Sequence, residues 1–223
     1  EEVSRIILTA SGGPFFGWDL AEMAEITPQQ ALAHPTWTMG PKITVDSATL
    51  MNKGFEVIEA SWLFDLQIDQ VDVVVHREST VHSMVEFVDG AILAHLGKTD
   101  MFLPIQYALT HPARRRAPSA SLDLLAVGAL HFAAPDRDSF PCLDLCYAAG
   151  REGGTTPAAL NAANEIAVAE FLAGRAGFTD INTTNRRVLD AWQTGVVDSI
   201  ETVVEADRRA RELAPASLAA RSS

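Results

Sequence analysis

The segment from Lys42 to Leu63 constrains the fold most, because its hydrophobic pattern changes part-way along. Ile43 and Val45 alternate with polar neighbours, which is typical of a strand. Asp46 or Ser47 can then serve as the N-cap of a helix. Four apolar residues recur beyond this point at helical spacing: Met51, Phe55, Ile58 and Trp62. The stripe predicts the helix face that packs into the core.

Polar side chains gather on a neighbouring face of the same expected helix. Asn52, Lys53 and Glu56 lie within one turn of each other, and Ser47 stands at the expected helix start, where free backbone N–H groups favour an anion. The Glu56 carboxylate is the type of ligand that hard divalent cations prefer. Two interpretations stay open: a phosphate and metal site, or a solvated helix face with one Lys-Glu pair.

Charge and hydropathy exclude several classes of protein. The chain has 223 residues and a formal net charge of -12, which opposes non-specific binding to nucleic acid or to anionic membranes. No apolar run approaches the ~20 residues that span a bilayer, and the N-terminus lacks the pattern of a signal peptide. We predict a cytoplasmic protein with neither nucleic-acid nor membrane partners, in which local donors capture any phosphate.

Two cysteines, Cys142 and Cys146, stand four positions apart. No other cysteine and no nearby histidine completes a zinc set. We interpret them as small buried hydrophobic residues.

Two glycine- or proline-containing segments precede the Lys42 to Leu63 region. Residues 6–13 predict a strand that ends in Ser11-Gly12-Gly13-Pro14, where Ser11 is either an anion donor or part of a plain turn. Residues 31–41 carry His34, Trp37 and Met39 without regular periodicity. This pattern fits a lid or a surface loop anchored in the core.

Further strands and helices organise the rest of the chain. Residues 71–75 alternate as a strand, and residues 84–96 read as a hairpin with a type I′ turn at Asp89-Gly90. Ser79 and His82 fall in the expected connection, where a structural role is favoured. Helices are expected near residues 143–149, 156–173, 180–192 and 199–213, the last with Asp198 and Glu201 as a capping box. The tail after Pro215 is expected to be disordered.

These elements predict an α+β fold, with a mixed or antiparallel sheet and its helices in residues 1–110. Residues 111–137 combine prolines, serines and a basic triplet, as a linker does. Residues 138–223 are expected to form a C-terminal α-helical bundle.

The motif VDSATLMNKGFEVIEA, at residues 45–60, resembles the signature of the 1-deoxy-D-xylulose 5-phosphate reductoisomerase family. Five other segments resemble that family in its order: LTASGGPF at 8–15, HPTWTMGPK at 34–42, VVVHRESTVHSMVEFVDG at 73–90, DMFLPI at 100–105 and LNAANEIAVAEFL at 160–172. The resemblance therefore covers nearly the whole chain. Arg77-Glu78 and Lys98-Thr99 depart from its usual residues, Pro-Gln and a pair ending in Pro, and a looser loop before Met101 is expected.

The resemblance implies a reaction in isoprenoid biosynthesis by the non-mevalonate route. A divalent metal (Mg, Mn or Co) supports rearrangement of 1-deoxy-D-xylulose 5-phosphate, and NADPH then reduces the product to 2-C-methyl-D-erythritol 4-phosphate. The family binds NADPH in an N-terminal domain with a Gly-rich fingerprint, and this fingerprint is not found in the sequence. We therefore expect the later part of a longer enzyme, and a homodimer joined through the sheet.

The resemblance also assigns residues. Phosphate and hydroxyl groups would contact Ser11, His34, Ser47, Asn52 and Lys53. Trp37 and Met39 would close over the carbon chain, and Met101 would contact the cofactor. Catalysis would rest on Lys53, Glu56 and His34, with Glu56 as a metal ligand.

The family's other metal carboxylates belong to an Asp-Ser-Glu motif upstream of the region matching Ile7, and this motif does not precede it here. We therefore expect the isolated chain to be inactive. One rival interpretation is a catalytically dead module that binds a phosphosugar or only dimerises. Another is a metal-dependent sugar-phosphate lyase, which would require three or more converging carboxylates.

Overall fold

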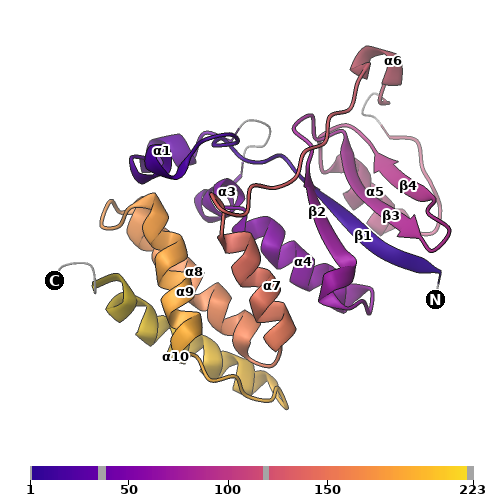
Figure 1. Ribbon diagram of the computed structural model, residues 1–223. Coiled ribbons are helices and arrows are strands. Elements are labelled where there is room, and N and C mark those ends of the chain that lie inside the picture. The colour runs from indigo at the N-terminus through magenta and orange to yellow at the C-terminus, as the bar shows by residue number, and fades with distance from the viewer. Residues whose placement is uncertain (1, 35–38, 118–120, 220–223) are drawn as a thin grey trace.

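A computed structural model describes residues 2–34, 39–117 and 121–219. A four-stranded sheet forms one part, and a helical bundle forms the other. Helix α4 (Met51–Leu63) runs between them, in contact with strands β1 and β2 on one side and helix α7 on the other (Figure 1). The expected α+β fold with a C-terminal bundle is confirmed, whereas the domain boundaries at 110 and 137 remain predictions.

The sheet has the strand order β2-β1-β3-β4. Strand β1 (Val3–Ala10) pairs in parallel with β2 (Val71–Val75) and antiparallel with β3 (Val81–Phe87). Strand β4 (Ile92–Leu96) extends the sheet antiparallel to β3. The expected mixed sheet is therefore present, with β1 inside it. Strand β1 lies between β2 and β3, and its last residue, Ala10, pairs with Val75 of β2.

The hairpin between β3 and β4 is confirmed, but its turn is not of type I′. That turn needs positive φ at both central residues, and here only Gly90, with φ 86°, adopts it. The Gly90 N–H donates to the Phe87 carbonyl at 2.9 Å, and the Phe87 N–H donates to the Ala91 carbonyl at 2.9 Å. The connection is thus longer than two residues, and it needs only one left-handed glycine.

The expected strand at Ile43 and Val45 is wrong, because Pro41–Ala48 forms helix α3. Pro41 stands in the first turn, where its fixed φ favours a helix, and the Thr44 hydroxyl donates to the Gly40 carbonyl at 2.8 Å. Val45 and Ala48, three residues apart, are both fully buried. Two alternating residues are too few to distinguish a strand from a short helix.

Helix α4 begins after Leu50, whose φ of 60° lies in the left-handed region. Neither Asp46 nor Ser47 caps it, in contrast to the prediction. Of the expected apolar stripe, Met51 and Ile58 are buried and Phe55 is half-buried, but Trp62 is 80% exposed. The prediction for Trp62 is wrong, since this side chain faces solvent near the end of α4 although Ala60 in the same turn is buried.

Helix α7 (Cys142–Glu152) packs directly on α4. A Cβ on Gly54 would stand 2.4 Å from the Cys146 sulfur, so only glycine allows this approach. Cys142 and Cys146 are both buried, as predicted, and burial raises the pKa of the Cys142 thiol to about 12. They are packing residues of the α4–α7 contact.

The bundle continues with α8 (Thr156–Leu172), α9 (Phe178–Ala191) and α10 (Ile200–Ala219). Helix α8 lies at its centre, in contact with α7, α9, α10 and also α3. Two predictions about α10 are wrong. Ser199, not the Asp198 and Glu201 pair, accepts the Thr202 N–H at 3.2 Å, and the helix continues through Pro215 to Ala219.

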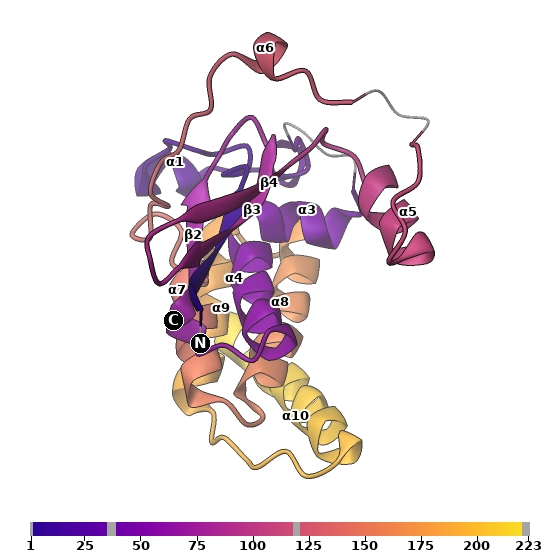
Figure 2. The same cartoon turned by 90° about the vertical axis from the view of Figure 1, so that its right-hand side faces the viewer.

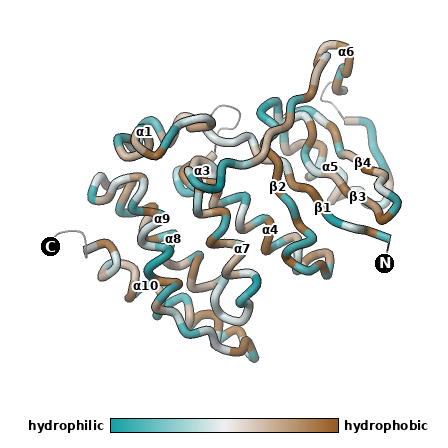
Figure 3. Tube along the Cα trace, in the orientation of Figure 1, coloured by the Kyte–Doolittle hydropathy of each residue, from teal (hydrophilic) through white to brown (hydrophobic). Residues whose placement is uncertain are grey.

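Five shorter helical elements complete the described residues: α1 (Leu20–Ala24), α2 (Pro28–Ala31), η1 (Ile68–Gln70), α5 (Phe102–Thr110) and α6 (Leu124–Val127). Neither α5 nor α6 has a buried residue, and Figure 2 shows both at the margin of the molecule, away from the bundle. The tip at α6 is nonetheless apolar (Figure 3). Within the described ranges, no helix has the length and hydropathy needed to cross a membrane.

Candidate active site

A cleft of about 570 Å³ opens where the end of β1, the α3–α4 junction, β3 and the start of α5 meet. It is lined by eight of the nine residues that the sequence singled out: Ser11, His34, Met39, Ser47, Asn52, Lys53, Glu56 and Met101. Trp37 lies outside the described residues. The structure therefore brings these eight residues together in one cleft, whereas the role of each residue remains a prediction.

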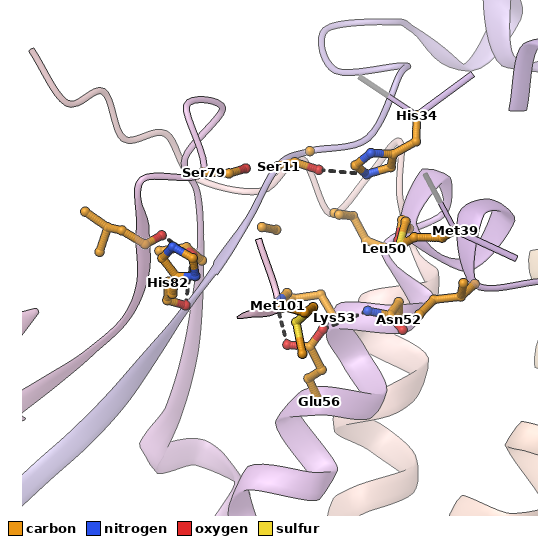
Figure 4. A pocket seen from close by; sticks show the side chains of 16 residues that line it. Ser11, His34, Met39, Leu50, Asn52, Lys53, Glu56, Ser79, His82 and Met101 are labelled. Atoms are coloured by element: carbon orange, nitrogen blue, oxygen red, sulfur yellow. Dashed lines mark hydrogen bonds and ion pairs between the residues drawn. The ribbon is translucent and has the colours of Figure 1, made fainter. Parts of the chain in front are cut away.

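Helix α4 supplies the polar wall of the cleft. The Glu56 carboxylate accepts hydrogen bonds from Asn52 Nδ2 at 2.7 Å and from Lys53 Nζ at 2.5 Å. The Lys53 side chain is only 14% exposed, so its charge is largely removed from bulk water. Both donors are oriented by the Glu56 carboxylate, which lies between them (Figure 4).

Ser47 reaches the cleft in a different way from the one predicted. It lies in the last turn of α3, not at a helix N-terminus, and it lines the cleft beside Leu50. The left-handed Leu50 turns the chain so that α4 starts next to the end of α3. Helix α4 therefore starts beside the cleft, at Met51, four residues after Ser47.

Ser11 extends from the turn after β1, opposite α4. Its Oγ accepts the Gly13 N–H at 3.3 Å and lies 3.3 Å from Nε2 of His34 (Figure 4). Burial lowers the pKa of the His34 imidazole below its ordinary value, which favours the neutral ring at pH 7. In a neutral His34, Nε2 can accept a hydrogen bond from the Ser11 hydroxyl.

Beneath Ser47, the neighbouring Asp46 is 1% exposed. Its carboxylate accepts from Lys42 Nζ at 2.8 Å and from Asn164 Nδ2 at 2.7 Å. Asn164 is itself buried and accepts from Asn185 Nδ2 at 3.0 Å. Burial raises the pKa of the Asp46 carboxyl, although the Lys42 and Asn164 hydrogen bonds oppose that rise. This network connects the cleft wall to two helices of the bundle.

Ser79 and His82 also line the cleft, on the side of the sheet. Ser79 adopts a φ of 51°, and its carbonyl accepts from the Thr99 hydroxyl at 3.2 Å. His82 lies within β3, not in a connection, and one ring nitrogen lies 3.2 Å from the Gly97 carbonyl. Thr99, at one of the unusual positions, therefore ties the segment before Met101 to this wall.

A divalent metal would find one carboxylate among the described residues that line the cleft, that of Glu56. In the described part of the chain, no group of three or more His, Cys, Asp or Glu side chains is arranged to hold a metal ion. Magnesium usually keeps one or two carboxylates together with substrate oxygens and water. Among the described residues, Glu56 would therefore supply one ligand, and the other ligands of a metal would have to be substrate oxygens, water or further residues.

Two known protein families match the sequence of this chain. Residues 96–213 match the family described as the DXP reductoisomerase C-terminal domain, and residues 1–64 match the 1-deoxy-D-xylulose 5-phosphate reductoisomerase C-terminal domain. The chain belongs to the 1-deoxy-D-xylulose 5-phosphate reductoisomerase family. The resemblance inferred from the motifs is thereby confirmed.

Curated reductoisomerases match along nearly the whole chain. The enzyme of Methylobacillus flagellatus is 55% identical over 209 residues, which are 94% of this chain and 53% of that protein. The enzyme of Moorella thermoacetica is 55% identical over 214 residues, 96% of this chain and 56% of that protein. The chain thus spans about half the length of the curated reductoisomerases it matches.

Solved reductoisomerases share the fold. The Zymomonas mobilis enzyme in complex with NADPH has a TM-score of 0.90 and 46% identity, covering 96% of this chain and 55% of that one. A DOX-P reductoisomerase in complex with NADPH, fosmidomycin and magnesium has a TM-score of 0.91 and 43% identity, covering 98% of this chain and 56% of that one.

Sequence reasoning missed several residues that line the cleft: Thr9, Ile43, Leu50 and Val81. It also treated Asp46 as a helix cap and overlooked its contact with Asn164. Lys42 stands four residues before Asp46, which is ion-pair spacing on a helix, but this signal depends on reading residues 41–48 as helical.

Proposed function

We propose that this chain forms the substrate-binding part of a 1-deoxy-D-xylulose 5-phosphate reductoisomerase. The complete enzyme would rearrange 1-deoxy-D-xylulose 5-phosphate and reduce the product with NADPH to 2-C-methyl-D-erythritol 4-phosphate, in non-mevalonate isoprenoid biosynthesis. One observation carries the proposal: in a chain of this family, Ser11, Ser47, Asn52 and Lys53 line a single cleft.

The phosphate group would lie among donors from four separate segments. Ser11 comes from the turn after β1, His34 from the loop after α2, Ser47 from the end of α3, and Asn52 with Lys53 from α4. Lys53 provides a positive charge in a chain whose net charge is -12, so a phosphate would be held locally and not by a basic surface. Met39 and Met101 offer apolar contact to the carbon chain, as Trp37 would from outside the described residues.

Metal and NADPH chemistry requires groups beyond those described. Glu56 would supply one ligand to a divalent cation such as Mg²⁺, Mn²⁺ or Co²⁺, which acts as a Lewis acid when bound. Lys53 and Asn52 orient the Glu56 carboxylate through their hydrogen bonds. The remaining ligands and the NADPH site would come from elsewhere in the complete enzyme, so we propose that the isolated chain does not turn over.

We also propose a homodimer, since apolar side chains at the edge of the fold are uncovered. Leu93 on the edge strand β4 is 65% exposed, and Leu109 on α5 and Leu125 on α6 are 83% and 94% exposed. A second copy that extended the sheet at β4 would cover such residues. A cytosolic location stays a prediction.

The second candidate is a catalytically dead module that binds a phosphosugar or only dimerises, and the single cleft carboxylate favours it for the isolated chain. A sugar-phosphate lyase is not supported by the described residues, because three converging carboxylates are not among them. Turnover of the complete enzyme, measured for the parent and for variants, distinguishes the candidates. Lys53→Ala or Glu56→Ala should reduce its turnover by far more than twofold, whereas turnover within twofold of the parent would contradict the site assignment.

Calorimetric titration of this chain with 1-deoxy-D-xylulose 5-phosphate tests the binding half of the proposal. Lys53→Ala should weaken binding about tenfold or more, because a hydrogen bond to a charged group is lost. Lys98→Ala is the matched control, since this exposed lysine does not line the cleft. Equal binding by wild type and Lys53→Ala would contradict the proposal. Binding that strengthens with Mn²⁺ would indicate further metal ligands beyond Glu56.

A further inference from the structure

Arg77 does not line the cleft, yet it holds the turn from which Ser11 enters it. Its Nη1 donates to the Gly13 carbonyl at 3.2 Å and to the Ser11 carbonyl at 3.4 Å. Its guanidinium also lies over the Phe16 ring, 5.0 Å from the centroid. One exposed side chain just after β2 therefore contacts the turn after β1 at three places.

The turn itself has little freedom to move. Gly12 and Gly13 have φ values of 78° and 64°. A Cβ on Gly13 would stand 3.0 Å from the Ser47 carbonyl oxygen, and one on Gly12 would stand 3.0 Å from Val75 Cγ1. The turn is therefore enclosed between the end of α3 and the end of β2.

The direction of one peptide follows from the Arg77 contact. A trans peptide is planar, so its C=O and N–H point to opposite sides. Because the Ser11 carbonyl faces Arg77 outside the cleft, the Gly12 N–H faces the other way, and Gly12 lines the cleft beside Ser11.

We propose that Arg77 is a positioning residue that fixes the Ser11–Gly12 peptide with the Gly12 N–H directed into the cleft, as an additional donor to the phosphate-bearing end of the ligand. The identity of that ligand rests on the proposed function. Ser11 Oγ and the Gly12 N–H would then approach the anion from the same turn. Arg77 acts through its hydrogen bonds to the backbone, not through its charge.

Titration of the ¹⁵N-labelled chain with inorganic phosphate tests this role through the Gly12 and Gly13 amide resonances. Arg77→Gln removes the charge, and Arg77→Lys keeps it but lacks the planar fork of donors. Both variants should shift the two glycine resonances without ligand and weaken phosphate binding about threefold to tenfold. Arg209→Gln is the control, since Arg209 is exposed and stacks on Trp192, 5.3 Å from the ring centroid. It should leave both measurements unchanged.

Two results would overturn the proposal. One is an Arg77→Lys chain that binds phosphate as tightly as wild type with unmoved glycine resonances, which would assign Arg77 a purely electrostatic role. The other is a Gly12 amide that does not respond to phosphate, including the case in which wild type binds none. The proposed function fails separately, when phosphate binds but 1-deoxy-D-xylulose 5-phosphate does not displace it. Unchanged amide resonances elsewhere show that each variant is folded.

Discussion

The Asp46 carboxylate accepts a hydrogen bond of 2.7 Å from Asn164, although 118 positions separate the two residues in the chain. Asp46 belongs to α3 and adjoins Ser47 of the cleft, whereas Asn164 belongs to the central helix of the bundle. Both side chains are almost completely buried. The bundle therefore does more than cover the sheet domain, because it holds one wall of the cleft through a polar contact.

Replacing Asn164 should destabilise the whole chain. Asn164→Leu leaves the Asp46 carboxylate and the Asn185 amide without this partner, and a buried polar group left unpaired costs about 1 to 3 kcal/mol, more when charged. We expect a loss of about 3 kcal/mol in the free energy of unfolding, measured by urea denaturation. Asn161→Leu, on the same helix but half-buried, should cost less than about 1 kcal/mol. Equal losses in the two variants would contradict this role.

The Asp46 carboxyl should also make stability depend on pH. Folding raises its pKa through burial, so the folded chain holds this proton to higher pH than the unfolded chain does. Its contribution is complete below the ordinary value of 3.8 and is lost as the pH rises through the raised folded pKa. Urea unfolding at several pH values should show this decline flattened in Asp46→Asn. An unchanged slope in that variant would exclude Asp46 as the cause, and Asp190→Asn, at an exposed position on α9, should retain the slope.

Gly54 should tolerate no side chain. Its Cβ would overlap the Cys146 sulfur at 2.4 Å and the Cys146 Cβ at 2.6 Å, so α4 and α7 would have to separate. Gly54→Ala is expected to cost about 1 to 3 kcal/mol by overpacking. Gly40→Ala is the matched control, because nothing lies within 4 Å of its added Cβ. Thermal unfolding of both variants measures the difference, and similar melting temperatures would contradict the close helix contact.

The His34 imidazole should titrate below its ordinary pKa of 6.5, because burial disfavours its charged form. Proton NMR of the ring measures the midpoint directly. Ser11→Ala should leave the midpoint low, since burial and not the Ser11 contact is the cause. Saturating phosphate should raise it, as a nearby anion favours the imidazolium. A midpoint at or above 6.5 in the free chain would contradict the half-buried position of the ring.

Local spacing was sufficient for some of these features and not for others. Asn52, Lys53 and Glu56 share a helix, so their proximity followed from sequence spacing. Ser11 and Ser47 meet them only through the pairing of β1 with β2 and the packing of α3 on α8, which the sequence does not display. Their convergence could be expected only from the family resemblance.

The wrong predictions have local causes too. Ile43 and Val45 fit a strand and a short helix equally well, and Pro41 with the buried contact of Asp46 to Asn164 decided for the helix. Trp62 fits the apolar spacing of α4, but its side chain is 80% exposed in the described structure. A proline normally ends a helix, yet α10 continues past Pro215, and Ala214 just before it is fully buried.

The distance between Ser47 and Lys53 depends on the torsion angles of only two residues, Thr49 and the left-handed Leu50, which lie between α3 and α4. Neither α3 nor α4 has to bend for that distance to change, because a change of torsion angles here would rotate one helix relative to the other. Redesign of the cleft for a longer or shorter phosphosugar could therefore begin at position 50, where glycine or asparagine would adopt the left-handed conformation with less strain. Ser47, Asn52, Lys53 and Glu56 would keep their side chains, whereas the Leu50 side chain, which lines the cleft, would be replaced.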